Sequence, residues 1–489
     1  MKAAVWLLAL AVAGRMLPSS FSQAADRPNF VLMLSDDQGW SGLSVPMHPN
    51  VPASKSAVIE TPNLEKLAAQ GMRFSAGYAP APVCSPTRIS LQTGKSPAQL
   101  HWTKAAPAEV GQKLVEPRLI KSIAASEITI AEILHSAGYA TAHYGKWHIN
   151  GGGPGAHGYD EHDGDIGNEQ AFKFTDPNPV DIFGMAERSA KFMEKCSKAN
   201  KPFFIQLSWN ALHASENAMK STLAKYQQRM AGESEKLIST GAISDDLDKG
   251  VGSVLDAIDR LGLAKNTFVI YMSDNGAGGG SRRGALRGGK GGVWEGGLRV
   301  PMIVRGPGVA ANAWCHTPVV GNDWFPTFCE LAGIPPNRLP RNIEGGSLAS
   351  LLTNHGRGDV KRPRDGLYFH FPHYQGEGGP QSAIQLDGLK LIRFYEDNRI
   401  ALFDLTKDIS ERNDLAKTLP EPASRLSKQL DNYLADVSAQ LPTSNQDYNP
   451  NQSTETRRDN QSQRKGGKQG GRQGGKDKGK NRAQPTSGR

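Results

Sequence analysis

Two pairs of oxygen ligands follow apolar, strand-like segments of the chain. Asp36 and Asp37 come directly after the first such segment, and Asp274 and Asn275 follow another. Adjacent carboxylates at the end of a buried strand repel each other unless a cation is bound. Taken alone, either pair could equally well be a metal site or part of a solvated turn or helix cap. Together, three carboxylates and an amide oxygen predict a site for Ca²⁺ or Mg²⁺.

A cysteine stands at the start of a predicted helix that begins just after residue 84. Cys84 is followed one turn later by Arg88, with Pro86 between them. The helix dipole and the guanidinium both favour negative charge at this point, so we expect an activated thiol. An oxyanion such as sulfate or phosphate would also bind there. The alternative is a buried, unreactive cysteine.

Four more side chains in loops could handle anions or protons. Lys146 and His148 lie two residues apart after an extended segment, where a lysine can bind a leaving oxygen and a histidine can transfer protons. Lys290 lies in the glycine-rich stretch 286–297, which lacks the Gly-Lys-Ser/Thr sequence of a P-loop. His213 is either a third proton-handling group or an ordinary loop histidine.

The elements that must position these side chains alternate between strands and helices. Such alternation predicts an α/β fold with a large, mostly parallel sheet flanked by helices, whose ligands bind at the carboxyl ends of the strands. The expected strands are 30–34, 139–144, 202–209, 267–272 and 301–304, and the expected helices are 61–67, 129–135, 186–196 and 244–261.

The pattern changes after residue 360. Short alternating segments at 367–371, 382–385, 389–395 and 400–404, then a helix at 423–434, predict a small antiparallel sheet with one helix. We therefore divide the chain into a signal peptide (1–24), a catalytic domain (25–360), a C-terminal α+β subdomain (361–442) and a disordered basic tail (443–489).

The net charge of +9 is concentrated at the two ends of the chain. Residues 455–489 contain 11 Lys and Arg against 3 Asp and Glu, and Lys2 and Arg15 add two more positive charges, so residues 26–454 carry a net charge of −1. No aromatic residue lies among the charges of residues 455–489, so base stacking has no support there. The tail is expected to contact polyanions through charge alone, without specific nucleic-acid recognition.

The first 24 residues have the pattern of a secretory signal. Lys2 precedes an apolar run and a small-residue stretch that ends at Ala24. We expect a periplasmic or extracellular protein without a membrane span after cleavage. Four cysteines are too few for a disulfide framework, although Cys315 and Cys329 could form one pair.

Several spaced motifs together resemble the type I sulfatases, formylglycine-dependent and arylsulfatase-like enzymes of the alkaline phosphatase superfamily. Cys84-x-Pro86-x-Arg88, followed by Thr93-Gly94, resembles the family signature in which the cysteine is converted to formylglycine. Further segments match other family blocks in the same order, namely 36–39, 138–148, 274–276 and 289–301, ending with 402–405 and 413–416. The resemblance implies hydrolysis of a sulfated glycan or aryl sulfate ester, with residue 84 matured by a formylglycine-generating enzyme.

Carried over residue by residue, the resemblance implies a role for each site residue. Asp36, Asp37, Asp274 and Asn275 would hold a divalent cation, usually Ca²⁺, together with the modified Cys84. The hydrated aldehyde at residue 84 would attack the sulfur. Arg88 and Lys146 would bind the sulfate group. His213 and Lys290 would assist departure of the leaving alcohol. His148 would abstract a proton from the group at residue 84.

Some features depart from the family pattern or fit other functions. Residues 211–215 lack the proline that frequently follows the position of His213 in the family. The segments 158–165 and 369–374 are expected at the substrate mouth, with packing of the domain interface as the alternative for 369–374. The rival functions are a phosphomonoester or phosphodiester hydrolase of the same superfamily and a non-catalytic polyanion binder.

Overall fold

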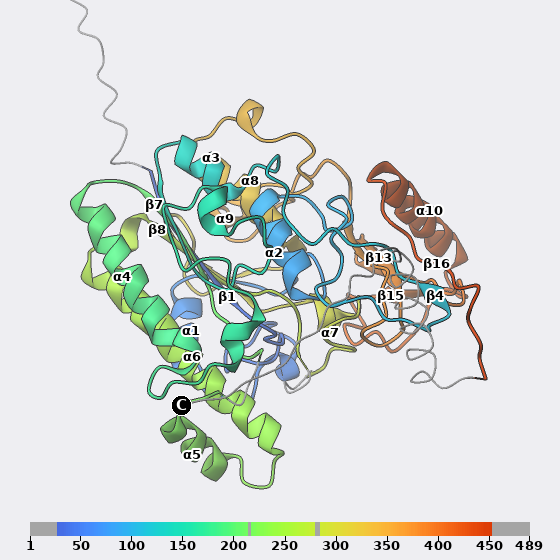
Figure 1. Ribbon diagram of the computed structural model, residues 1–489, viewed down its shortest axis with the longest axis horizontal. Coiled ribbons are helices and arrows are strands. Elements are labelled where there is room, and N and C mark those ends of the chain that lie inside the picture. The colour runs from blue at the N-terminus through green and yellow to red at the C-terminus, as the bar shows by residue number, and fades with distance from the viewer. Residues whose placement is uncertain (1–26, 214–216, 279–283, 452–489) are drawn as a thin grey trace, which may run out of the picture.

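The computed structural model describes residues 27–213, 217–278 and 284–451. Its largest sheet contains β1 (Asn29–Ser35), β2 (Met72–Phe74), β5 (Ala140–Gly145), β6 (Glu161–His162), β7 (Phe203–Ser208), β8 (Thr267–Ser273), β9 (Met302–Arg305) and β10 (Ala313–Cys315). The strand order is β10-β2-β9-β8-β1-β7-β5-β6 (Figure 1). Only β9 is antiparallel to its neighbours. The predicted α/β fold with a mostly parallel sheet is confirmed.

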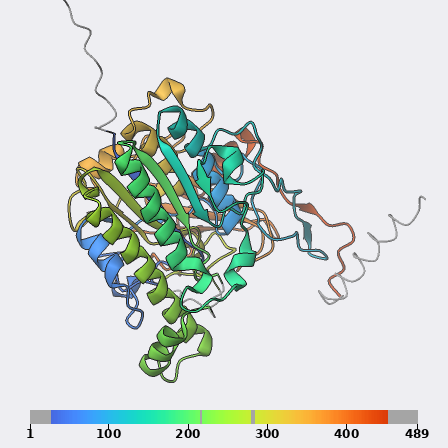
Figure 2. The same cartoon turned by 60° about the vertical axis from the view of Figure 1, so that its left-hand side comes forward.

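Helices cover both faces of this sheet (Figures 1 and 2). One face carries α1 (Pro62–Ala69), α4 (Ile182–Lys198) and α6 (Glu235–Arg260), with α5 (Lys220–Arg229) packed on α6. The other face carries α2 (Cys84–Thr93), α3 (Ile130–Ser136), α8 (Trp324–Leu331) and α9 (Ala349–Thr353). Successive residues of a strand point to opposite faces, so Val31 and Met33 of β1 pack with the first group and Leu32 with the second.

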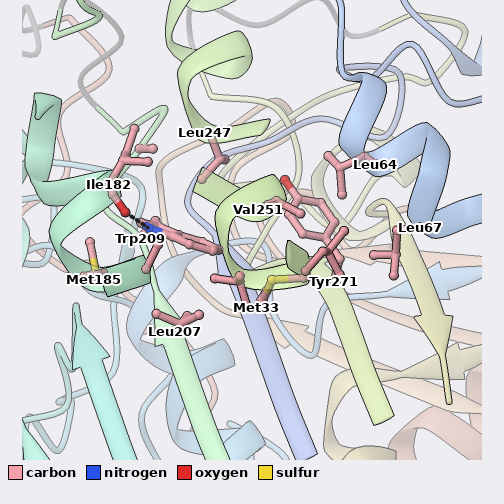
Figure 3. Close-up of a cluster of buried hydrophobic side chains, with 14 of the residues drawn as sticks. Met33, Leu64, Leu67, Ile182, Met185, Leu207, Trp209, Leu247, Val251 and Tyr271 are labelled. Carbon is pink, nitrogen blue, oxygen red and sulfur yellow. Dashed lines mark hydrogen bonds between the residues drawn. The ribbon is translucent and has the colours of Figure 1, made fainter. Parts of the chain in front are cut away.

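The first of these two cores is drawn in Figure 3. Met33 and Tyr271, from the neighbouring strands β1 and β8, meet Leu64 of α1 and Val251 of α6. The indole of Trp209 follows β7 and donates a hydrogen bond of 3.2 Å to the carbonyl of residue 182, at the start of α4. This bond satisfies a buried N–H group that would otherwise be costly. The core thus fixes the loop after β7 relative to α4.

Helix ends follow the signals in the local sequence. The Thr129 side chain accepts a hydrogen bond of 3.2 Å from the Glu132 N–H, and the Glu132 carboxylate accepts one of 2.7 Å from the Thr129 N–H. This reciprocal capping box begins α3. Pro62 occupies the first position of α1, where its missing N–H leaves no hydrogen bond unmade.

A second sheet lies toward the C-terminus, at the right of Figure 1. It contains β12 (Leu367–Phe371), β13 (Gln381–Leu386), β14 (Leu389–Phe394) and β15 (Ile400–Asp404), all antiparallel, and α10 (Pro420–Asp436) packs on it. The predicted antiparallel sheet with one helix is confirmed. Its other face shares a core with the catalytic part, where Phe369 and Phe371 meet Tyr78 and Trp294.

The shorter elements connect these layers. They are β3 (Gly77–Tyr78) paired with β11 (Val319–Val320), β4 (Leu114–Val115) paired with β16 (Thr443–Ser444), α7 (Glu295–Leu298), and the 3₁₀ helices η1 (Pro52–Ser54), η2 (Pro154–His157), η3 (Asn168–Phe172), η4 (Pro179–Asp181), η5 (Ala264–Asn266), η6 (Gly321–Asp323) and η7 (Pro336–Arg338). In the part of the chain that the structure describes, no helix has the length and apolarity to cross a membrane.

Two sequence-based expectations need correction. The tail does not begin at residue 443, because Thr443 and Ser444 pair with β4 and Asn445 bonds to the same segment. The predicted signal peptide, residues 1–24, and the part of the predicted tail from residue 452 onward lie outside the described residues. Cys315 and Cys329 are free thiols in separate elements, β10 and α8, so the suggested disulfide is not formed.

Candidate active site

The paired ends of β1 and β8 bring the predicted metal ligands together. Ser35 and Ser273 are register partners in parallel strands, so Asp36 and Asp274 emerge side by side at the same sheet edge. The N–H of Asp37 donates to Oδ1 of Asp274 over 3.2 Å. All three carboxylates are buried. The pairing of β1 with β8 thus brings together Asp37 and Asp274, which are 237 residues apart in the sequence.

Cys84 places its sulfur beside these carboxylates. It is the first residue of α2, and its Sγ lies 3.5 Å from Oδ1 of Asp36 and 3.4 Å from Nζ of Lys290. One possible ligand atom from each of Asp36, Asp37, Cys84 and Asp274 lies within 4.8 Å of the others. The four residues form a compact buried cluster at the N-terminus of α2.

Three cations surround the cluster. Arg88 donates two hydrogen bonds to Oδ2 of Asp274, of 3.1 Å and 2.7 Å, and a third of 2.6 Å to the carbonyl of Lys146. The ammonium of Lys146 lies 2.5 Å from Asp36, and that of Lys290 lies 2.6 Å from Asp37. Only the Lys290 side chain is appreciably exposed, at 19%. Lys290 is therefore the cation that faces the open side of the site.

The electrostatics of the cluster correct one prediction from the sequence. Burial raises the pKa of the Cys84 thiol to about 12, because it outweighs the nearby lysines and because Asp36 and Asp274 add negative charge. The expected activated thiolate is therefore wrong. A helix N-terminus lowers a thiol pKa only where the thiolate keeps sufficient solvation. Burial therefore favours the protonated form of the Cys84 thiol.

The carboxylates respond differently to the same burial. Burial alone would raise the pKa of Asp36, but Lys146, then His213 and Arg88, outweigh it and hold this pKa well below its ordinary value. Burial and the charge of Asp36 raise the pKa of Asp274 to about 6. Negative charge is therefore least compensated around Asp274, where an added cation would be favourable.

A divalent cation fits the donor set. Oδ1 of Asn275 is buried and has no hydrogen-bond partner among the residues that the structure describes, while its Nδ2 donates a hydrogen bond of 2.8 Å to Oδ1 of Asp37. An orphaned amide oxygen beside three buried carboxylates has the hard-oxygen chemistry that Ca²⁺ and Mg²⁺ prefer. The residues present are thus suited to hold such an ion.

The two candidate histidines lie next to this cluster. The Nδ1 atoms of His148 and His213 are buried, and no described residue is within hydrogen-bond reach of either. Burial, aided by Lys146 and Arg88, lowers the pKa of His148 to about 3. Burial also lowers the pKa of His213, although Asp36 opposes this effect. The His148 ring is therefore neutral at physiological pH.

The predicted substrate-mouth segments have different environments. Asp163, from the segment 158–165, lines a cavity of about 420 Å³. In the segment 369–374, the His373 ring instead contacts Glu116 at 2.8 Å and Thr103 at 2.7 Å and is fully buried. His373 packs the interface, which was the alternative for this segment. Sequence reasoning missed Glu116 because its partner is more than 250 residues away.

The comparisons with known proteins agree with this architecture. Residues 28–334 match the Sulfatase family, and residues 289–440 match the C-terminal family of N-sulphoglucosamine sulphohydrolase. Human arylsulfatase A is 29% identical over 440 residues, covering 81% of this chain and 80% of that protein. Rat N-acetylgalactosamine-6-sulfatase is 31% identical over 351 residues, covering 64% and 63%.

A solved structure shows the same fold. The crystal structure of Ps i-CgsB in complex with k-i-k-neocarrahexaose aligns with a TM-score of 0.70 at 23% identity and covers 84% of this chain and 93% of the other. The fold and the family match define the chain as a member of the sulfatase family, as the sequence motifs predict. The protein is therefore an enzyme of the sulfuric ester hydrolase class.

Proposed function

We propose that this sulfatase removes sulfate from a sulfated carbohydrate, using a formylglycine made from Cys84 and a bound divalent cation, Ca²⁺ rather than Mg²⁺. The observation that carries the proposal is the buried cluster of Asp36, Asp37, Asp274 and Asn275 around Cys84. A carbohydrate substrate is supported by the relatives, one an N-acetylgalactosamine-6-sulfatase and another bound to k-i-k-neocarrahexaose.

The charges around Cys84 suit this chemistry. Three carboxylates face the three cations Arg88, Lys146 and Lys290, so these side chains sum to zero charge. A dication and the sulfate dianion that leaves as product would together keep the buried site neutral. Because an unpaired buried charge is destabilising, binding of the dication together with the sulfate dianion is favoured over binding of either ion alone.

Conversion of Cys84 would remove the difficulty that its thiol does not ionise. With a pKa of about 12, the thiol is a poor nucleophile at neutral pH. A hydrated aldehyde at the same position would supply an oxygen nucleophile. Cys84 is 2% exposed in the folded protein, so a formylglycine-generating enzyme would have to act before folding is complete.

The surrounding side chains would bind the sulfate group and transfer protons. A bound cation would polarise the sulfate oxygens. Lys146 and Lys290 would stabilise charge that develops on those oxygens, and Arg88, held on Asp274, would complete the positive wall. His148, a neutral imidazole, would accept a proton from the group at residue 84. His213 and Lys290 would assist departure of the alcohol.

Two measurements test the proposal. Mass spectrometry of the peptide 74–88, from protein made with a maturation enzyme, should show the aldehyde at residue 84. Cys84→Ala should abolish sulfate release with an unchanged fold, whereas the buried but distant Cys196→Ala should retain it. An unmodified thiol in a fully active enzyme, or faster cleavage of a matched phosphate ester, would overturn the proposal.

The proposal extends to the organisation and location of the protein. Catalysis is assigned to residues 25–360 and support of the site to residues 361–442, with export directed by residues 1–24. The mature enzyme would then act in the periplasm or outside the cell. N-terminal sequencing of the mature protein should begin near residue 25, and an intact Met1 in the secreted fraction would contradict cleavage.

A further inference from the structure

The segment 166–174 is tied to both loops that carry the candidate histidines. The N–H groups of Trp147 and His148 both donate to the carbonyl of Ile166 over 2.9 Å. The Asn210 side chain donates a hydrogen bond of 3.0 Å to the carbonyl of Gly167. The backbone N–H of His213 donates one of 3.2 Å to the carbonyl of Asn210. This segment is therefore held at the edge of the active site by its backbone.

Phe172 projects from this segment at the end of η3. It is 68% exposed, the highest value for a large hydrophobic side chain among the residues that the structure describes. Its ring stands perpendicular to the His213 ring, with the ring centroids 6.2 Å apart. The preceding backbone position is held too, because the side chain of Asn217 donates a hydrogen bond to the carbonyl of Ala171. A rigidly mounted aromatic ring is thus left in water beside a catalytic histidine.

Polar side chains next to Phe172 in the sequence line a cavity of about 420 Å³. Gln170 and Lys173 line it together with Asn210, while Phe172 itself lies outside its lining. Lys290 is the partly exposed cation of the site, and with His213 it is the residue proposed to assist the leaving alcohol, so the alcohol part of the ester would lie on their side of the site. A pyranose ring offers an apolar C–H face to an aromatic ring and hydroxyl groups to amides and lysines.

We propose that Phe172 is the apolar wall on which the sugar ring of the substrate packs, and hence a specificity-determining residue. This inference rests on the proposed sulfatase function. Phe172 would act on the alcohol half of the ester and have no part in holding sulfate. It would therefore distinguish a sugar ester from the free anion.

The test compares Phe172→Ala with Phe174→Ala in the full, matured enzyme. Phe174 lies two residues away, is 41% exposed and has no ring contact with His213 among the described contacts, so it controls for loss of surface aromatic area. The substrates are the 6-sulfates of galactose, N-acetylgalactosamine and glucosamine. Inorganic sulfate, a ring-free competitive inhibitor, probes the anion site alone.

For Phe172→Ala, KM for the best sugar sulfate should rise about three- to tenfold, the range expected for loss of one aromatic contact. The inhibition constant for sulfate should stay within twofold of the wild-type value, and Phe172→Trp should restore KM. Phe174→Ala should change neither constant. A merely structural role would shift both constants together and would not be rescued by tryptophan.

Two outcomes would overturn the inference while leaving the sulfatase function intact. One is an unchanged KM in Phe172→Ala. The other is a wild-type enzyme that cleaves an aryl sulfate but none of the three sugar sulfates. Failure of the sulfatase function itself would be recognised separately, by an unmodified Cys84 and no release of sulfate from any ester.

Discussion

The ammonium of Lys146 lies 2.5 Å from Oδ2 of Asp36, and both side chains are fully buried. Lys146→Met should lower kcat/KM for a sulfate ester by about 10²–10³, the usual cost of one lost donor to developing negative charge. It should also destabilise the fold by about 3–5 kcal/mol, because Asp36 loses its nearest counter-charge. Steady-state kinetics and thermal unfolding measure the two effects.

The control for this variant is Lys191→Met. Lys191 pairs with Glu187 on the exposed surface of α4, where its side chain is 71% exposed. Exposed pairs of this kind contribute about 0–1 kcal/mol. Its replacement should change neither activity nor stability measurably. If Lys146→Met retained kcat/KM within twofold of the wild-type value, the assignment of Lys146 to sulfate binding would be wrong.

Asn275 provides a direct test of the cation site. Asn275→Ala removes the orphaned buried oxygen and should weaken Ca²⁺ binding at least about tenfold. Isothermal titration of the full chain with CaCl₂, after treatment with EDTA, measures this independently of catalysis. Asn322→Ala, another buried asparagine outside the cluster, should bind Ca²⁺ like the wild type. Equal affinities in all three proteins would exclude Asn275 as a ligand.

A buried ion cluster connects β14 of the second sheet to α7, and loss of its lysine should destabilise the fold. Nζ of Lys390, in β14, lies 2.8 Å from Glu295 and 2.9 Å from Glu411, and all three side chains are fully buried. Lys390→Met leaves Glu411 without its counter-charge, whereas Glu295 keeps its ion pair of 2.6 Å with Arg299, and the variant should cost about 3–5 kcal/mol of unfolding free energy. Adding Glu411→Gln should recover part of it, because one stranded charge is removed.

Urea denaturation measures these differences. Lys407→Met is the matched control, since Lys407 pairs with Asp404 but its side chain is 83% exposed. A loss below 1 kcal/mol for Lys390→Met, or no recovery in the double variant, would show that the cluster is not a stabilising link between β14 and α7.

Local signals predict the elements well, and the exceptions have physical causes. Helix α3 is foreseen because its capping residue Thr129 is adjacent in sequence. Helix α8 is not among the predicted helices, and it contains Pro326 in its first turn, where proline is tolerated. Helix α6 begins at Glu235, earlier than the predicted start at 244, and Ser234 caps it.

The sequence predicts which residues belong to the site but not which of them contact each other. The position of each residue after a strand places Asp36, Asp274 and Lys146 at one sheet edge. That Arg88 binds Asp274 across 186 residues follows only from the folded structure. The thiol of Cys84 shows the same limit, because burial reverses the pKa shift that helix position alone would suggest. Desolvation depends on the whole fold and leaves no local mark in sequence.

His370 should make the fold sensitive to acid. Its ring is buried in β12, with Nδ1 2.6 Å from the Ser382 hydroxyl and Nε2 3.0 Å from the carbonyl of Gln440. Burial lowers its pKa from 6.5 to about 4. Between these two pH values the unfolded chain binds a proton at His370 that the folded protein does not bind. The contribution of His370 to the unfolding free energy is therefore fully present above pH 6.5 and is lost as the pH falls toward 4.

The predicted loss at His370 is about 3 kcal/mol across this window. His370→Gln cannot titrate, so the stability advantage of the wild type over this variant should shrink by about that amount between pH 7 and pH 4. Urea denaturation of both proteins at half-unit pH steps measures it, and other titrating groups cancel in the difference. Parallel stability curves over this range would mean that His370 is protonated in the folded state as readily as in the unfolded chain.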